Sequence, residues 1–535
     1  MNRLQNLHSR FKHINLQEHW SERKIITPHS AMHKTNIILS RKAKTFALLA
    51  VAIMISIVNV YTSRWMYPIP GGDSAGQLVP AINWRSGHGL TNQLFALTDE
   101  FDRSGQHRFM QYPPLFHFVV GTMMISTSSV DAFTAVAILD GLCLIIYAWL
   151  ICSRKISGCI LDENRGFIVA LLSITAMATW LSNYYTGRPE ALAQLLVLTA
   201  TGLSIILPET YRLPTLAILL GLLGGTHPAG TVLFGMMIAT YEAFTAKNGL
   251  VWFTRVALIA ISAIAISLIC LSGNGYPIKE SVLGILAHAT HLSKESSVAK
   301  SSSELLHYYL FRNDASFYGL YLMFFLGVMA YSLFYMHEKP QKAIIISLAA
   351  FTCMLVYLFA IHTPKRNYNI LLFIPALTVT LFKLLLQPAL QSDWVKRLLR
   401  GCLQVLFALM SLGFARQLIM FPSYCFRGVH YTEARRNFAG IHPHNHQGIR
   451  VSGSLWVLTD NFNEITIGNT LEKTDVPSVL ILQQNYYTEL TPPIIPSLHV
   501  AEDNYLRETS TFLGLKIGST IPGYAFAVYE REPQD

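Results

Sequence analysis

Long apolar stretches constrain this chain more than any other feature of its sequence, because a transmembrane helix needs about 20 mostly apolar residues. Only 13% of the residues are charged, whereas soluble domains carry about 25%. The sequence therefore predicts a mainly α, polytopic transmembrane helical bundle with about eleven spans. The predicted spans are roughly 43–60, 131–152, 166–182, 190–207, 213–225, 229–246, 250–271, 317–336, 343–361, 368–386 and 401–421.

Two apolar stretches leave alternatives open. Pro228 interrupts the apolar stretch 213–246, which could form two spans or a single kinked helix. The stretch 113–128 is short for a span. If it does not cross and the N-terminus is cytoplasmic, nearly all basic loop clusters fall inside, as the positive-inside rule requires. We therefore predict that 113–128 forms a juxtamembrane helix within a first outer loop, 61–130.

Composition along the chain predicts three parts. Residues 1–42 are polar and are expected to be a cytoplasmic segment, and residues 43–421 contain the spans. Residues 422–535 are expected to form a small extracytoplasmic α/β domain. The net charge is +10, but Lys and Arg flank the spans, so we expect a lipid bilayer and not nucleic acid as the partner. Strands are predicted within Leu455–Thr459, Val476–Leu482 and Tyr524–Tyr529.

Two acidic residues stand out on the predicted outer side. Asp73 lies in Gly71-Gly72-Asp73-Ser74, where small neighbours permit close approach of a substrate. Glu190 ends the corner Gly187-Arg188-Pro189-Glu190 and opens an apolar helix. Each also fits a purely structural role, Asp73 as a helix N-cap and Glu190 at the positive end of a helix. The alternative is that both carboxylates face one outer cleft, with Arg188 beside them.

One basic pair breaks the charge rule. Lys365 and Arg366 fall on the predicted outer side, directly before an apolar helix that begins near Tyr368. A cation placed against the orientation bias is explained if it binds an anion, and Arg can hold a phosphate through two parallel hydrogen bonds. The simpler alternative is that both side chains extend into anionic lipid headgroups.

Six segments follow one another along the chain: Gly72-Asp73-Ser74, Gly87-His88-Gly89-Leu90, Tyr112-Pro113-Pro114-Leu115, Arg188-Pro189-Glu190, Thr226-His227-Pro228 and Lys365-Arg366-Asn367-Tyr368. Their order resembles the GT-C class of membrane glycosyltransferases, in particular bacterial members related to the aminoarabinose lipid A transferase and the protein O-mannosyltransferases. The resemblance covers about residues 43–380. Two positions depart from relatives: Gln111-Tyr112 precedes the proline pair where many carry Lys or His, and Glu190 stands where some carry Asp.

The resemblance implies an inverting transfer from a polyprenyl-phosphate-linked sugar to a lipid, glycan or protein acceptor. It further implies a cell inner membrane location with a periplasmic C-terminal domain. Asp73 would be the base and Glu190 the second catalytic carboxylate. A divalent metal ion stays open as a cofactor. Lys365, Arg366 and Arg188 would bind the donor phosphate, and His88, Tyr112, His227 and Tyr368 would position the substrates.

Other classes of function remain as alternatives. A transporter or flippase of lipid-linked sugars would place ionisable residues near the bilayer midplane, where only Asp140 clearly fits. A membrane scaffold that displays the C-terminal domain would leave the outer Lys365 and Arg366 unexplained. The seven cysteines include no CxxC and indicate neither a disulfide framework nor a thiolate metal site. A His-x-His-x-His segment at His442, His444 and His446 fits a polar loop better than a zinc site.

Overall fold

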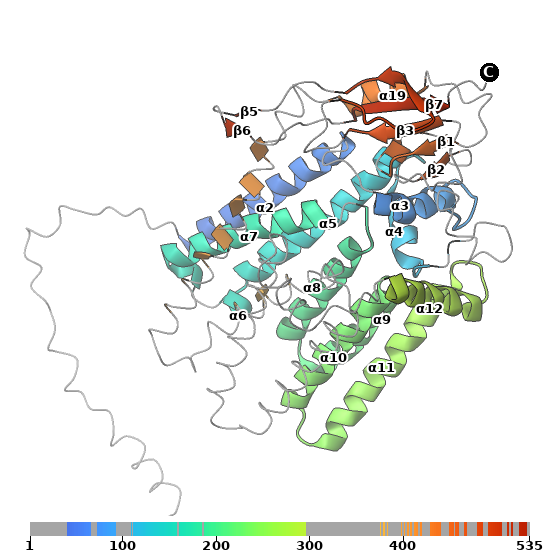
Figure 1. Cartoon of the computed structure of the whole chain (residues 1–535). Coiled ribbons are helices and arrows are strands. Elements are labelled where there is room, and N and C mark those ends of the chain that lie inside the picture. Colours follow the sequence, from blue (N-terminus) through green and yellow to red (C-terminus); the bar gives the residue numbers. More distant parts are fainter. Residues whose placement is uncertain are drawn as a thin grey trace, which may run out of the picture. The chain divides into compact units, whose positions relative to one another are not determined.

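In a computed structural model, Arg41–Asp535 form one compact unit, and Figure 1 shows its elements. The predicted spans 317–336 and 343–361 lie outside the described residues, as does the segment His442–His446. The structure describes residues 40–65, 72–92, 109, 111–157, 160–184, 187–295, scattered positions between 375 and 419, 429–439, 449–453, 455–459, 465–467, 479–484, 491–505, 511–512, 515–516 and 524–531.

Three described helices are long and apolar enough to cross a membrane: α2 (Arg41–Arg64), α5 (Ser129–Cys152) and α11 (Gly249–Ser272). α5 is mostly buried within the protein, whereas α2 and α11 leave most of their apolar surface exposed. A helix whose apolar side chains face outward is stable when lipid, and not water, surrounds it. The described residues therefore form a mainly helical membrane protein, with three of the predicted spans present at full length.

Shorter helices occupy four further predicted spans. The interrupted stretch 213–246 forms two separate helices, because α9 ends at Gly224 and His227 caps the next helix at its N-terminus. This result excludes the single kinked helix. The four helices are α7 (Asn164–Tyr184), α8 (Glu190–Ile206), α9 (Glu209–Gly224) and α10 (Pro228–Thr245).

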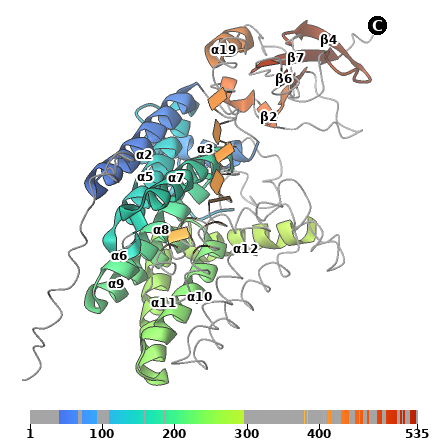
Figure 2. The same cartoon turned by 90° about the vertical axis from the view of Figure 1, so that its left-hand side faces the viewer.

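Part of the predicted first outer loop folds into two short helices, α3 (Gly72–Arg85) and α4 (Leu115–Met123). The nine residues of α4 would extend only about 13 Å, less than half of the hydrocarbon thickness. α4 is thus too short to span a bilayer, and its juxtamembrane position stays a prediction. After α11, the chain forms a further helix, α12 (Ile278–Glu295), that runs across the end of α11 (Figures 1 and 2).

Small residues form close contacts between helices. Ser56 of α2 donates a hydrogen bond from its hydroxyl to the carbonyl oxygen of Gly141 in α5, at 3.2 Å. Ser267 of α11 donates in the same way to Gly221 of α9, at 3.0 Å. Close approach of backbones through Gly and Ser is typical of helix packing inside membranes, where dispersion and interhelical hydrogen bonds replace the hydrophobic effect.

Polar contacts gather at one set of helix ends. Arg41 and Lys44 of α2 reach Asp162, in the 3₁₀ turn η3 (Ile160–Asp162) before α7. Lys155, in the short helix α6 (Arg154–Ser157), donates to the carbonyl oxygen of Ile206 at the end of α8. A second cluster joins α9, α10 and α11 through Glu209, Arg212, Glu242 and Arg255.

The C-terminal residues form a mixed five-stranded sheet of order β2-β1-β3-β7-β4, in which β1 pairs in parallel with β2 and β3. β7 pairs antiparallel with β3 and β4. The helix α19 (Tyr431–Ala439) precedes the sheet. The strands are β1 (Ile449–Val451), β2 (Ile465–Ile467), β3 (Val479–Gln483), β4 (Leu498–Asp503) and β7 (Phe526–Arg531), with a separate hairpin of β5 (Thr511–Phe512) and β6 (Leu515–Lys516).

One predicted strand is wrong. Leu455–Thr459 contains a 3₁₀ helix, η5 (Leu455–Leu458), in place of a strand. All four residues of η5 are buried, so the segment lacks the alternation of inward and outward side chains that a half-buried strand shows. The strands predicted within Val476–Leu482 and Tyr524–Tyr529 are confirmed by β3 and β7.

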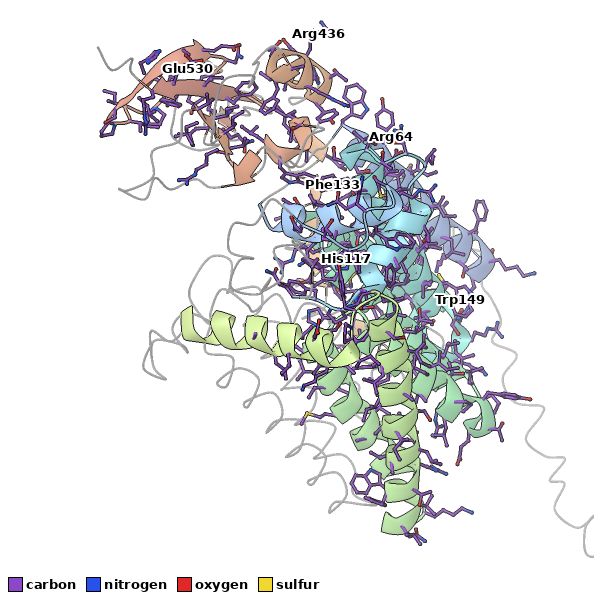
Figure 3. All side chains as sticks on the ribbon, turned by 90° about the vertical axis from the view of Figure 1, so that its right-hand side faces the viewer. Arg64, His117, Phe133, Trp149, Arg436 and Glu530 are labelled. Carbon is purple, nitrogen blue, oxygen red and sulfur yellow. The ribbon has the colours of Figure 1, made fainter. Side chains whose placement is uncertain are left out.

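The sheet shares one hydrophobic core with the helices. Trp456 of η5 is fully buried, and its ring centroid lies 6.0 Å from that of Phe133 in α5. Tyr431 of α19 and Ser129 of α5 both donate to the carbonyl oxygen of Val457, at 3.1 and 3.3 Å. The C-terminal part therefore packs on the first turns of α5, and Figure 3 shows Phe133 at this contact.

Candidate functional site

The corner Gly187–Glu190 is held directly against α3. Gly187 has φ +76, which favours glycine, and a Cβ added there would lie 2.8 Å from Cβ of Ser74 and 2.9 Å from Cδ1 of Leu78. Ser74 follows Asp73, the second residue of α3. The fold therefore brings the backbone of Asp73 and the Glu190 corner together, although they are more than a hundred residues apart; the side chain of Asp73 lies outside the described residues.

Glu190 is the first residue of α8, and its side chain is almost completely buried. Arg188 binds it through two parallel hydrogen bonds, Nη2 to Oε1 at 3.0 Å and Nε to Oε2 at 3.2 Å. A buried carboxylate needs such a partner, because an unpaired charge in the interior is very costly. The N-terminus of α8 adds a further favourable dipole. Arg188 thus holds Glu190 in a fixed position.

His227 belongs to the same region. It caps α10, and its Nδ1 accepts a hydrogen bond of 2.9 Å from the backbone N–H of Gly230. An imidazole that accepts at Nδ1 carries its proton at Nε2, so the neutral ring presents a donor there. His227 also lies within electrostatic range of Glu190. The region therefore combines the Arg188–Glu190 pair at the start of α8 with the His227 cap at the start of α10.

The proline pair leads into this region from another part of the chain. The backbone N–H of Leu115, the first residue of α4, donates to the carbonyl oxygen of Gly225 at 3.0 Å, just before the His227 cap. Tyr112, three residues earlier, is half-buried and stacks on Phe109 with ring centroids 6.1 Å apart. The structure thus attaches the Tyr112 segment to the α9–α10 junction.

His88 lies elsewhere. It is exposed, between two glycines with positive φ, three residues beyond the end of α3. Asp73 is at the other end of α3, so the helix alone separates them by about 18 Å at 1.5 Å per residue. Lys365, Arg366 and Tyr368 lie outside the described residues.

His117 is a residue of this region that the sequence analysis did not single out. It lies in α4, is fully buried, and contacts Phe109 and Phe116 edge-on. Burial lowers the pKa of His117 to about 3, against a smaller opposite effect of the Pro113 and Pro114 carbonyl groups. The imidazole is therefore neutral. Figure 3 shows His117 in the interior, whereas Trp149 points away from the helices. In the sequence, the position of His117 three residues after the proline pair was the feature that could have indicated it.

No metal cluster is found among the residues that the structure describes: no three His, Cys, Asp or Glu side chains lie close enough to hold an ion. Both carboxylate oxygens of Glu190 accept a hydrogen bond from Arg188. Chemically, the site offers a fixed arginine–carboxylate pair and a neutral histidine donor beside the first turn of α3.

Comparisons with known proteins give little further information. No protein-family model and no curated protein matches the chain. Among solved structures, the chain is similar to the crystal structure of the Archaeoglobus fulgidus oligosaccharyltransferase in the apo form, with 12% sequence identity and a TM-score of 0.39. The match covers 79% of this chain and 64% of that chain.

Proposed function

We propose that the protein is a GT-C type glycosyltransferase that moves a sugar from a polyprenyl-phosphate donor to an acceptor hydroxyl or amine at the outer face of the membrane. One observation carries the proposal. The corner with Arg188 and Glu190 packs against the first turn of α3, which bears Asp73. This contact supports a site to which both acidic positions contribute, at helix ends where a donor anchored in the bilayer by its lipid tail would present its sugar.

In the proposed reaction, Asp73 takes the proton of the acceptor while the acceptor oxygen or nitrogen attacks the anomeric carbon. The bond from that carbon to the phosphate oxygen breaks, and polyprenyl phosphate leaves with the bonding electrons. A single displacement of this kind inverts the anomeric configuration. Glu190, held by Arg188, would orient the acceptor, and the Nε2–H of His227 would donate to a substrate oxygen.

The leaving phosphate needs positive charge that is already in place. Lys365 and Arg366 are our proposed donors to it, with Arg188 as a third. The pairing of Arg188 with Glu190 at 3.0 Å supports a shared role, in which one guanidinium orients the carboxylate and adds positive charge nearby. Tyr112, His88 and Tyr368 would contact the sugar or the acceptor.

The experiment compares envelope glycans and lipids by mass spectrometry with and without the gene, and then in cells that carry variants. Removal of the gene should eliminate a sugar modification. Asp73→Asn keeps the shape of the side chain and removes the base, so we expect about a 10²-fold loss of that modification at normal protein levels. Asp102→Asn, the same change in the same outer loop, is the control and should restore it fully. Full activity of Asp73→Asn would contradict the assignment of the base.

A further inference from the structure

The helix α12 exposes large aliphatic side chains. Ile278, Leu283 and Leu286 are 40%, 53% and 56% exposed. At 100° per residue, these three side chains share the outward half of the helix, while Ser281 is buried and accepts a hydrogen bond from Asn274 at 2.8 Å. A helix with an outward apolar side and a polar contact to its own protein requires a covering apolar medium.

The position of α12 identifies that medium. α12 follows α11 after a short turn, and α11 exposes an apolar surface along its whole length, including Phe253, Ile261 and Ile269. α11 is one of the candidate membrane spans, and little of it is buried. The outward apolar side chains of α12 begin where this surface ends. Both surfaces therefore require the same surroundings, first the bilayer core and then its boundary.

A hydrogen bond fixes the turn between α11 and α12 to another part of the protein. The hydroxyl of Tyr276 donates to the carbonyl oxygen of Leu90 at 3.3 Å, which ties the turn to the segment after α3. α12 then runs across the end of α11 and does not continue it (Figures 1 and 2). Lys279 lies among the exposed aliphatic residues, and its long chain allows the ammonium to reach water from the edge of an apolar surface.

We infer that α12 is an interfacial helix that lies along the membrane surface, with Ile278, Leu283 and Leu286 inserted among the lipid acyl chains. The apolar face of an amphipathic helix in this position is buried about 5–10 Å into the boundary between headgroups and acyl chains. Glu280, on the opposite side of the helix from Ile278, faces water. The inference concerns the lipid partner of α12 and is independent of the proposed transferase activity.

The test places a genetically encoded dansyl amino acid in the full chain at Leu286, at Glu280 or at Ile261, and reconstitutes each protein in nanodiscs with brominated lipids. Bromine quenches the probe at short range, so its position along the acyl chain reports depth. We expect quenching at Leu286 at least about threefold stronger than at Glu280, and strongest with bromines near the headgroup. Ile261, in the middle of α11, should respond most to bromines deep in the bilayer.

Three outcomes would overturn the inference. Equally weak quenching at Leu286 and Glu280 would place α12 in water. Strong quenching at Ile261 with none at Leu286 would mean that another segment of this chain or a second copy covers the apolar side. Deep bromines acting most strongly at Leu286 would also exclude an interfacial position. The Ile261 probe shows in each case that the protein is inserted.

Discussion

Two buried polar side chains, Glu190 and His117, differ in whether they carry a charge. Glu190 is buried as an ion and keeps its charge beside Arg188, which donates two hydrogen bonds to it. His117 is buried without a charged partner and stays neutral, since burial lowers its pKa to about 3. The pairing with Arg188 fixes the position of the Glu190 carboxylate. The burial of neutral His117 makes the stability of the protein depend on pH.

We expect His117 to destabilise the protein in acid. An unfolded histidine takes up a proton near pH 6.5, whereas folded His117 does so only near pH 3. Between these values the unfolded state binds more protons, so stability falls by up to about 1.4 kcal/mol for each pH unit below 6.5. Between pH 7.5 and 5, the midpoint temperature of thermal unfolding should therefore fall less in His117→Gln than in the parent. The exposed His88→Gln is the control, and equal pH dependence of His117→Gln and the parent would contradict the account.

At the level of elements, the corner before α8 depends on its close contact with α3. Gly187 and Gly275 have the same φ of +76, but only Gly187 has neighbours where a Cβ would be. A comparison of alanine at the two positions therefore separates backbone strain from steric contact.

Gly275→Ala should cost about 1 kcal/mol from strain at positive φ. Gly187→Ala should cost about 1–3 kcal/mol more, because the new methyl group must displace Ser74 or Leu78. Thermal unfolding of both variants in the same detergent measures the difference. If the two variants unfold at the same temperature, the corner does not pack tightly on α3.

Ion pairs hold α9, α10 and α11 together at the ends opposite the candidate site. Glu242 is fully buried and pairs with Arg212 at 3.0 Å and with Arg255 at 3.2 Å. Glu209 pairs with Arg255 as well, but its side chain is half-exposed. The buried carboxylate should therefore matter far more than the exposed one.

Glu242→Gln should destabilise the protein by about 3–5 kcal/mol, because it leaves two arginines without their shared buried partner. Glu209→Gln should cost less than about 1 kcal/mol, since water screens an exposed pair. Unfolding midpoints measured at low salt test both values. If Glu209→Gln destabilised the protein more than Glu242→Gln, the exposed carboxylate and not the buried one would hold the three helices together.

At the level of the whole molecule, the described contacts divide the helix ends into two sets. One set contains the Glu190 corner, the start of α3, the His227 cap, α4 and the packed C-terminal sheet. The other contains Arg41, Lys155 and the Glu242 ion pairs. From the positive-inside rule we expect the basic set to be cytoplasmic, which would place the candidate site outside.

Cysteine labelling in intact cells tests this orientation. We expect a membrane-impermeant maleimide to label cysteines introduced at Ser293 and Thr488, and to leave one at Lys342 unlabelled until the cells are opened. Labelling of the parent protein gives the background signal from the native cysteines, of which Cys143 and Cys152 are buried. Labelling at Lys342 alone would reverse the orientation and place the site in the cytoplasm.

The sequence by itself determined where the described membrane helices lie, because the length of an apolar stretch and the interruption at Pro228 act locally. It also indicated strands β3 and β7. It did not determine that Leu455–Leu458 turns into a 3₁₀ helix, or that α12 exposes an apolar side. Above all, only the tertiary structure decided which helix ends meet. The contact of Gly187 with Ser74 and the pairing of Glu242 join segments that are distant in sequence, and no local pattern of residues encodes such packing.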